Sequence, residues 1–380
     1  MEFRPSDDHL AFQRTVREFA LAEVAPHVAE WDRAGSLPVG IVHAMGELGL
    51  FGLPFPERWG GSGGDFLSLC LAIEEIGRVD QSVGVTLSAG VGLGATPIFR
   101  YGNDEQRSRW LPDLVSGRAL AAFGLTEPDG GSDAGATRTR ATPTDDGWVL
   151  NGAKAFITNS GTPITSVVTV TARTPDGQIS SFLVPSKTPG FTVAPAPHKL
   201  GWHASDTHDL SFEDCVVEHR SLLGEAGHGY RNFLSILDDG RVALAALALG
   251  CAQACLDHSV AYAKERQAFG GPIGRFQAIA FALADLSVAV ENARNLTYKA
   301  AWLKDSGQPF GPLAAMAKLY STEAAVSATR VATQVFGGSG FMEDSPVARL
   351  YRDAKILEIG EGTSEIQRLV IARGLGLPVG

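Results

Sequence analysis

One acidic residue stands in a setting that suits proton chemistry. Glu361 lies between Gly360 and Gly362, immediately before a predicted helix. Flanking glycines allow its side chain to project into a cleft, and an apolar cleft raises the pKa of a carboxylate toward the pH at which a general base works. Ser364 and Gln367 fit a capping box, which explains the start of the helix. Capping does not require Glu361, so this residue is the candidate base.

A second segment, residues 122–133, carries the pattern of a ligand-binding loop. Gly130 and Gly131 have no side chains, so the backbone there can approach a flat ligand closely. Thr126 and Ser132 add hydroxyl groups that pair with polar ring or amide atoms. An ordinary β-turn loop after a strand explains the same residues. These residues alone do not decide between a ligand-binding loop and a structural turn.

Three blocks of predicted structure must position these segments. Residues 1–120 are predicted to be helical, with Ser6 as the candidate N-cap of the first helix and Asp7 or Asp8 as the alternatives. The glycines at residues 90–94 predict close helix packing, because no strand precedes them as a dinucleotide site requires. Residues 121–225 contain β-branched runs between turn signals such as Asn151-Gly152, which predict a β domain with antiparallel connections.

Residues 226–380 form the third block. Their apolar positions repeat every 3.6 residues over long stretches without proline, which predicts a C-terminal four-helix bundle. The predicted fold class is therefore mainly α with a central β domain, the latter barrel-like and antiparallel.

The composition excludes several classes of function. The 380 residues are 44 % hydrophobic and 19 % charged, as in a globular protein and unlike a disordered one. Lys and Arg number 32 against 42 Asp and Glu, a net charge of −10, which argues against a nucleic-acid or anionic-membrane binder. A local basic pocket for a phosphate-bearing ligand is compatible with this balance.

Signals for export, membrane insertion and metal binding are missing from the sequence. Residues 1–8 have neither a basic nor an apolar targeting segment. The longest apolar run, residues 242–256, is shorter than the ~20 residues of a membrane span. The four cysteines include no C-x-x-C pair, which fits a reducing cytoplasm. His203 and His208 lack a third ligand at suitable spacing, so no metal site is predicted.

Four spaced segments resemble the acyl-CoA dehydrogenase family. They are residues 122–133 (AFGLTEPDGGSD), 265–278 (ERQAFGGPIGRFQA), 334–338 (QVFGG) and 351–368, which contain YRDAKI and EGTSEIQR. The resemblance covers the whole chain and agrees with the helical, β, helical order. It implies an FAD enzyme that desaturates acyl-CoA thioesters between the α and β carbons. It also implies a homotetramer that passes electrons to electron-transfer flavoprotein.

The resemblance implies where the cofactor binds. Leu125 and Thr126 are expected to touch the flavin ring, and Ser132 to lie between the flavin and CoA. Phe156 is expected against the flavin face and Thr158 near flavin N5. Arg266 suits a pyrophosphate as a fixed cation, and residues 334–338 would reach the FAD of a neighbouring subunit, although their glycines also fit a helix C-cap. The complete set of implied cofactor-binding residues is Leu125, Thr126, Gly131, Ser132, Phe156, Thr158, Arg266, Phe269, Gln334, Gly337, Gly338, Thr363 and Glu365.

The family's base aligns with Glu361, which would remove an α proton while a hydride leaves the β carbon for flavin N5. In some members the base comes from the long helix instead, where this chain has Gly240, and glycine cannot abstract a proton. Gly360 stands where members often have Tyr, and loss of that ring is predicted to widen the pocket beside the base, which favours branched or bulky acyl groups over short linear ones. The predicted substrates overall are thioesters of short or branched acyl chains. The implied substrate-binding residues are Ser132, Asp238, Arg241, Gly360, Gly362 and Arg373.

Other functions are compatible with part of this pattern. An acyl-CoA oxidase, or a dehydrogenase of carrier-protein thioesters, would share the fold and the base. A flavin monooxygenase on this fold has no use for a base at Glu361, and a helical scaffold protein needs none of the clustered motifs. The favoured function is a cytoplasmic acyl-CoA dehydrogenase of fatty acid or branched-chain amino acid degradation.

Overall fold

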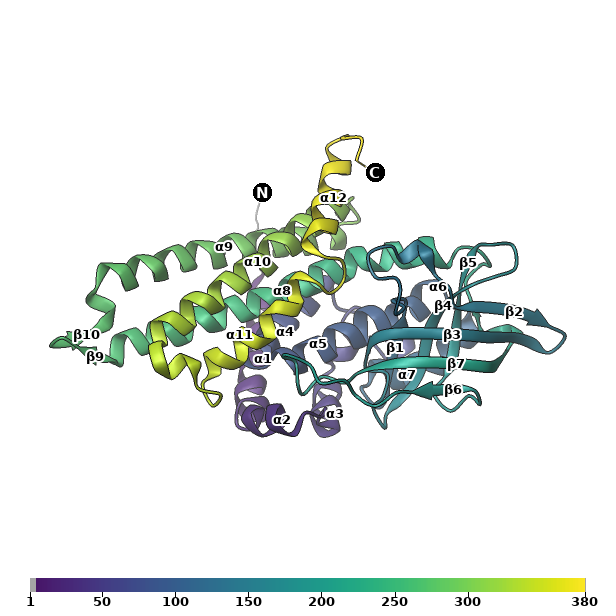
Figure 1. Cartoon of the computed structure of the whole chain (residues 1–380), viewed down its shortest axis with the longest axis horizontal. Coiled ribbons are helices and arrows are strands. Elements are labelled where there is room, and N and C mark those ends of the chain that lie inside the picture. The colour runs from purple at the N-terminus through teal and green to yellow at the C-terminus, as the bar shows by residue number, and fades with distance from the viewer. Residues whose placement is uncertain (1–4, 380) are drawn as a thin grey trace.

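A computed structural model describes residues 5–379. Residues 1–4, part of the segment in which no targeting signal is predicted, and Gly380 lie outside the described residues. Figure 1 shows a β layer at one end of the molecule and long helices that run to the opposite end. The N-terminal part consists of α1 (Asp7–Phe19), α2 (Val28–Ala34), α3 (Val39–Glu47), α4 (Phe66–Val79), α5 (Gln81–Ala89), α6 (Thr96–Tyr101) and α7 (Asp104–Val115).

Local sequence explains how the N-terminal helices begin and pack. Ser6 caps α1 in a capping box with His9, as predicted for this N-cap. The glycines of residues 90–94 lie in a π-helical turn where the chain packs closely. A Cβ on Gly90 would lie 2.8 Å from a Phe51 ring carbon, and one on Gly94 would lie 2.7 Å from the Ala121 carbonyl oxygen. Close packing is therefore confirmed for Gly90 and Gly94, whereas a Cβ on Gly92 would meet nothing within 4 Å.

The continuous helical stretch Gln81–Tyr101 is long and apolar enough to span a membrane by length and composition, with a mean hydropathy of 1.4. From the sequence, residues 242–256 are the longest apolar run, so the sequence points to a different segment as the most apolar one. Of the most apolar window in Gln81–Tyr101, 83 % is buried inside the protein. Its apolar character is therefore accounted for by the core of the protein's own fold.

The middle part is a sheet of eight strands: β1 (Leu120–Gly124), β2 (Arg140–Thr144), β3 (Gly147–Thr158), β4 (Thr165–Arg173), β5 (Ile179–Pro185), β6 (Phe191–Val193), β7 (Thr207–Glu218) and β8 (Leu222–Leu223). Strand order along the sheet is β6-β7-β3-β2-β4-β5-β8, with β1 paired to β4. Neighbours are antiparallel as predicted, except that β1 runs parallel to β4 and one residue pair joins β2 and β4 in parallel. A parallel pair is possible because a long connection separates the two strands in sequence.

The predicted turn at Asn151-Gly152 is wrong. Both residues lie inside β3, where the register with β7 shifts between Leu150 and Gly152. Gly152 has a φ of +148° and lies so close to Thr139 that a Cβ would approach Thr139 Oγ1 to 2.6 Å. The glycine therefore marks a β-bulge with close backbone approach.

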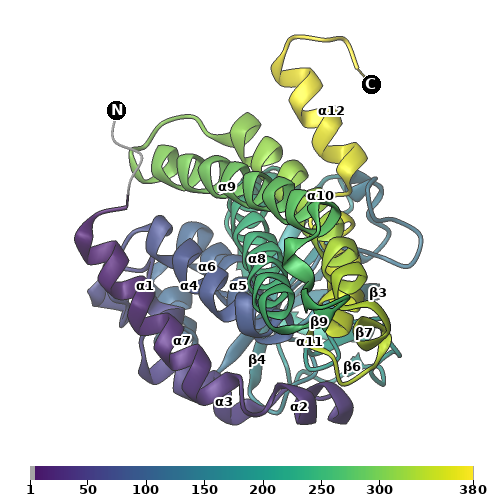
Figure 2. The same ribbon diagram turned by 90° about the vertical axis from the view of Figure 1, so that its left-hand side faces the viewer.

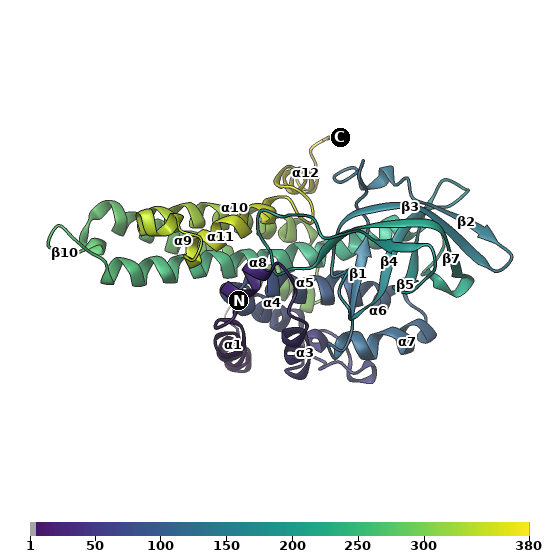
Figure 3. The same cartoon turned by 60° about the horizontal axis from the view of Figure 1, so that its bottom comes forward.

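The C-terminal part is the predicted helical bundle. Helix α8 crosses the whole molecule, from the β layer to the far end (Figure 3). Its residues 242–249 are all buried, and Cys251 and Cys255 are buried free thiols. The bundle helices are α8 (Gly229–Glu265), α9 (Gln277–Asp305), α10 (Gly311–Phe336) and α11 (Pro346–Ala354), followed by the short helix η9 (Lys355–Glu358) and by α12 (Ser364–Gly374).

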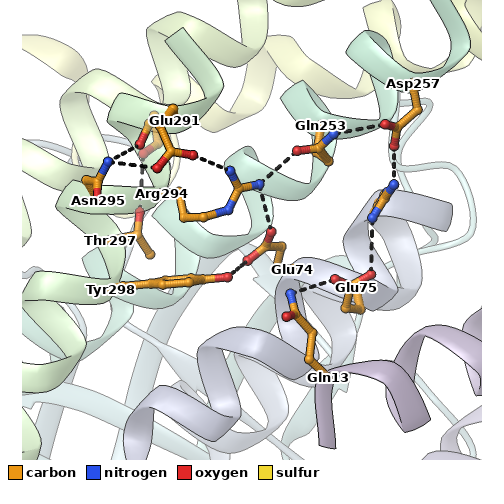
Figure 4. A network of polar contacts seen from close by, with 12 residues as sticks. Gln13, Glu74, Glu75, Gln253, Asp257, Glu291, Arg294, Asn295, Thr297 and Tyr298 are labelled. Carbon is orange, nitrogen blue, oxygen red and sulfur yellow. Dashed lines mark hydrogen bonds and ion pairs between the residues drawn. The ribbon is translucent and has the colours of Figure 1, made fainter. Parts of the chain in front are cut away.

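A buried polar network joins α1 and α4 to the bundle (Figure 4). The fully buried Glu74 of α4 accepts a hydrogen bond from the Tyr298 hydroxyl at 2.6 Å and lies 3.5 Å from the guanidinium of Arg294, both on α9. The adjacent Glu75 accepts two hydrogen bonds from Arg17 of α1, at 2.7 and 2.8 Å. Because a buried charge without a partner is costly, the Glu74 contacts hold α4 against α9 of the bundle, and the Glu75–Arg17 pair holds α1 against α4.

Candidate active site

The candidate base lies in a turn between η9 and α12. Glu361 has a φ of +53° and Gly362 a φ of +94°, so two consecutive residues adopt left-handed backbone conformations. Glycine tolerates this conformation, whereas glutamate is strained in it, and strain of this kind is maintained where surrounding contacts over-determine the backbone. The turn therefore orients Glu361 at the expense of local stability.

The predicted capping box is wrong by one residue. Thr363 is the N-cap of α12, and its hydroxyl accepts a hydrogen bond from the Ile366 amide at 3.3 Å. Ser364 is the first residue of the helix, and its buried hydroxyl has no hydrogen-bond partner. Gln367 turns back to the carbonyl oxygens of the Glu361 turn, so it belongs to the site.

The Glu361 carboxylate points at Gly240 of α8. A Cβ built on Gly240 would lie 2.0 Å from Glu361 Oε2, so the missing side chain makes the space that the carboxylate fills. Glu361 is half-buried as a whole residue, but its Oε2 atom is buried and has no hydrogen-bond partner. Burial raises the pKa of Glu361 to about 7, against the opposing charges of Lys318 and Arg241. These are the properties expected of a general base.

Substituting Gly240 with alanine should displace this carboxylate without unfolding the protein. The added methyl group overlaps the end of a flexible side chain, so the backbone stays in place while the Glu361 carboxylate moves. We expect a loss in kcat/KM of about tenfold or more, since small displacements of a reacting group have large effects on rate. Gly40→Ala is the matched control, because a Cβ on Gly40 in α3 meets nothing within 4 Å. Equal activity of both variants would contradict the assigned carboxylate position.

Buried polar atoms without partners gather around the Glu361 turn. They come from the turn, from α8 and from α12: Glu361 Oε2, Arg241 Nε, Ser364 Oγ and Gln367 Oε1. Buried polar groups are nearly always paired in folded proteins, so this concentration indicates a site for a ligand with polar atoms. Asp238, an implied substrate contact, forms an ion pair with Arg241 beside these atoms, and burial raises the pKa of Asp238.

The loop of residues 125–132 lies against strand β3. The amide of Ala155 donates a hydrogen bond to the Thr126 carbonyl at 2.8 Å, and Lys154 Nζ donates one to the Leu125 carbonyl at 3.1 Å. Gly131 and Ser132 are exposed, and a Cβ on Gly131 would meet nothing within 4 Å. The structure thus brings the predicted loop residues next to the predicted strand residues.

A β-bulge turns Phe156 outward. The register between β3 and β7 shifts between Lys154 and Ile157, and Phe156 has a φ of +61°. Its amide donates to Asp209 Oδ1 at 3.0 Å, and 70 % of the residue is exposed. Bulges re-aim side chains near functional sites, and an exposed ring in a strained conformation offers a stacking face. Thr158, two residues further along, is half-buried.

Five other predicted cofactor residues lie at the end of the molecule opposite the β layer. Arg266 and Phe269 belong to the hairpin of β9 (Gln267–Ala268) and β10 (Gly271–Pro272), far from the β layer in Figure 1. Phe269 is 90 % exposed, with a φ of +52°. Gln334 and the two glycines of residues 337–338 lie at the C-terminal end of α10, and a Cβ on either glycine would meet nothing within 4 Å. One chain does not bring these residues to Phe156.

Helix α12 carries the remaining predicted residues. It projects from the body of the molecule (Figure 2). Thr363 caps the helix beside Glu361, whereas Glu365 and Arg373 are exposed on it. Gly360 precedes the base, and a Cβ there would approach only the Ile356 carbonyl oxygen, at 3.5 Å. A Cβ at this position would thus make only an ordinary van der Waals contact.

Two buried lysines near the site were not predicted from the sequence. Lys154 and Lys318 are both 0 % exposed, although lysine is among the residues least often buried. Each interrupts an otherwise apolar or small-residue stretch, residues 153–157 and 314–317 with 319. That interruption is the available signal, since an isolated lysine within a buried pattern needs a specific partner. Among the described residues no cluster of three or more His, Cys, Asp or Glu could hold a metal ion.

The structure combines a helical, a β and a second helical part with a buried carboxylate suited to proton abstraction. Family models for the N-terminal, middle and C-terminal domains of acyl-CoA dehydrogenase match residues 6–118, 122–215 and 227–376. A probable acyl-CoA dehydrogenase of Bacillus subtilis is 49 % identical over 378 residues, which are 99 % of this chain and 100 % of that protein. The chain belongs to the acyl-CoA dehydrogenase family.

Other relatives agree with this assignment. The mitochondrial short-chain specific acyl-CoA dehydrogenase of mouse is 46 % identical over 96 % of this chain and 89 % of that protein. The structure of butyryl-CoA dehydrogenase from Megasphaera elsdenii has a TM-score of 0.96 at 43 % identity, covering 99 % of this chain and 100 % of that one. A glutaryl-CoA dehydrogenase from Mycobacterium smegmatis, in complex with FADH2, has a TM-score of 0.94 at 32 % identity, over 98 % and 95 %.

Proposed function

We propose that this enzyme is an FAD-dependent dehydrogenase of short-chain acyl-CoA thioesters, with Glu361 as its base. The observation that carries the proposal is the Glu361 carboxylate, buried without a hydrogen-bond partner in the space left by Gly240. Relatives named for short-chain acyl-CoA and butyryl-CoA support the substrate class. The open space beside Gly360 is compatible with short and with branched acyl groups.

The described residues fit FAD. A flat, partly apolar ring system matches the exposed face of Phe156 and the side-chain-free approach at Gly131. We propose that the residues holding it are Leu125, Thr126, Gly131, Ser132, Phe156, Thr158, Arg266, Phe269, Gln334, Gly337, Gly338, Thr363 and Glu365. When bound, FAD supplies the acceptor for the hydride that leaves the β carbon.

The chain's own residues carry the proton transfer. Glu361 takes the proton from the α carbon, and its buried, raised-pKa carboxylate is a strong enough base to do so near neutral pH. Gly240 leaves the carboxylate room beside α8. Arg241 supplies a fixed positive charge behind the base, and its ion pair with Asp238 sets the direction of the guanidinium. Proposed substrate contacts are Ser132, Asp238, Arg241, Gly360, Gly362 and Arg373.

A complete cofactor site needs more than one chain under this proposal. Arg266 and Phe269 lie far from Phe156 within the chain, so they serve an FAD bound by another subunit. The proposed assembly is a homotetramer of cytoplasmic enzyme with electron-transfer flavoprotein as acceptor. Each subunit is proposed to consist of a helical domain at residues 1–120, a β domain at 121–225 and a helical bundle at 226–380.

The visible spectrum of the purified protein tests the function. We expect bound flavin that is bleached anaerobically by butyryl-CoA, faster than by long-chain acyl-CoA thioesters. Bleaching by no thioester at all would overturn the proposal. Rapid oxygen consumption with each turnover would instead identify an acyl-CoA oxidase.

The pH dependence of the reaction follows from the raised pKa of Glu361. Only the ionised carboxylate accepts a proton, and its pKa is about 7. We expect kcat/KM for butyryl-CoA to fall about tenfold for each pH unit below about 7 and to level off above it. The measurement is the initial rate between pH 5 and 9 with an artificial electron acceptor. A flat profile across about pH 5–7 would contradict a buried Glu361 base.

A further inference from the structure

A fully buried lysine lies beside the Glu361 turn. Lys318 of α10 is 0 % exposed, and its Nζ donates a hydrogen bond of 2.8 Å to the carbonyl oxygen of Gly362, the residue after the base. Burial lowers the pKa of Lys318 to about 8, against the raising effect of the Glu361 charge. A carbonyl group satisfies one donor but carries no negative charge, so the ammonium charge interacts with the nearby carboxylates, chiefly that of Glu361.

Gln367 of α12 holds the same turn from the other side. Its Nε2 donates to the carbonyl oxygens of Glu361, at 3.3 Å, and of Gly362, at 2.9 Å, and the residue is 0 % exposed. Two buried donors therefore fix two consecutive carbonyl groups in a turn with left-handed backbone. Such contacts are what a strained glutamate needs to keep its conformation.

Resting on the proposed role of Glu361 as base, we propose that Lys318 is a positioning residue of proton abstraction. Its ammonium group holds the Gly362 carbonyl so that the Glu361 carboxylate points at Gly240, and its charge stabilises the ionised carboxylate. Gln367 shares the first task but, being neutral, not the second. The two residues thus separate the geometric from the electrostatic contribution.

The electrostatic part depends on all charges near the carboxylate. They come from every element packed against the turn: Lys318 on α10, Asp238 and Arg241 on α8, Glu358 on η9 and Glu365 on α12. The two cations lower the pKa of Glu361, and Arg241 is already paired with Asp238. Lys318 is therefore the cation whose removal should change the ionisation of Glu361 most directly.

The test compares the acid limb of the kcat/KM profile in three variants. Lys318→Met removes charge and donor, and should lower the plateau and move the limb upward by about one pH unit, because a nearby cation favours the ionised form. Gln367→Met should lower the plateau and leave the limb in place. Lys187→Met is the control: Lys187 is an exposed lysine in the turn after β5, and its loss should change neither.

A second readout does not depend on turnover. Infrared difference titration of the holoenzyme against Glu361→Gln reports the ionisation of Glu361 directly, and Lys318→Met should shift it upward by the same amount. Should Lys318→Met fail to fold, Lys318→Gln keeps a donor for the Gly362 carbonyl and must show the same shift. An unchanged titration in a folded Lys318 variant would overturn the electrostatic role of Lys318, and an unchanged plateau in Lys318→Met would overturn its positioning role. Absence of bleaching in the wild-type enzyme would instead overturn the proposed function. The titration needs no turnover, so the two failures can be told apart.

Discussion

Replacing Glu361 with glutamine should produce a yellow protein that acyl-CoA no longer bleaches. Glutamine has nearly the same shape, so the turn between η9 and α12 and its contacts with Lys318 and Gln367 are retained. It cannot accept the α proton, and removal of a positioned general base typically reduces the rate by about 10²- to 10⁴-fold. The measurement is the anaerobic bleaching rate with butyryl-CoA, together with the flavin content of the purified variant.

A matched change elsewhere separates loss of the base from loss of a negative charge. Glu343, an exposed residue in the loop before α11, offers this control, and Glu343→Gln should bleach within about twofold of the wild-type rate, as expected of a surface substitution. Wild-type bleaching by Glu361→Gln would remove Glu361 from the mechanism. Loss of the flavin itself would show that the variant tests cofactor binding and not proton transfer, and Glu361→Asp would then replace it.

Removal of the Lys154 ammonium should have the largest effect on stability. Lys154 Nζ forms a buried ion pair with Glu127 Oε1 at 2.7 Å and bonds to Thr171 Oγ1 at 3.1 Å, and these contacts hold the loop of residues 125–132 on β3. Burial lowers the pKa of Lys154 to about 8, and Glu127 keeps it charged at neutral pH. Lys154→Met leaves the Glu127 carboxylate buried without its cation, which costs about 3–5 kcal/mol of unfolding free energy. We expect a lower Tm and a lower flavin content.

An exposed ion pair in the same loop is the natural comparison. Asp129 pairs with Arg138 at 2.5 Å, but their side chains are 64 % and 74 % exposed. Exposed pairs contribute about 1 kcal/mol or less, so Asp129→Asn should leave Tm and flavin content nearly unchanged. Equal Tm values for the two variants would show that burial of the Lys154–Glu127 pair does not stabilise the loop.

Patterns that depend on near neighbours in the chain were predicted correctly. Ser6 caps α1 because a cap involves residues three apart, and the long helices follow from apolar positions repeated every 3.6 residues. The same local patterns misled at two places. Thr363 and not Ser364 caps α12, and Asn151-Gly152 forms a bulge inside β3 and not a turn. The bulge depends on pairing with strand β7, which is distant in sequence, whereas the cap moves by one residue because the adjacent turn at Glu361 and Gly362 sets where α12 begins.

The sequence by itself determined the order of the three parts, the family resemblance and the candidacy of Glu361, since these rest on residue types and short spacings. Only the tertiary structure decided what surrounds that carboxylate. Gly240 and Lys318 are distant from Glu361 in the chain and meet it because α8 and α10 pack beside the turn. The outward turn of Phe156 and its separation from Phe269 were likewise decided by the fold. Burial and charge pairing are properties of packed elements, so no local pattern of letters specifies them.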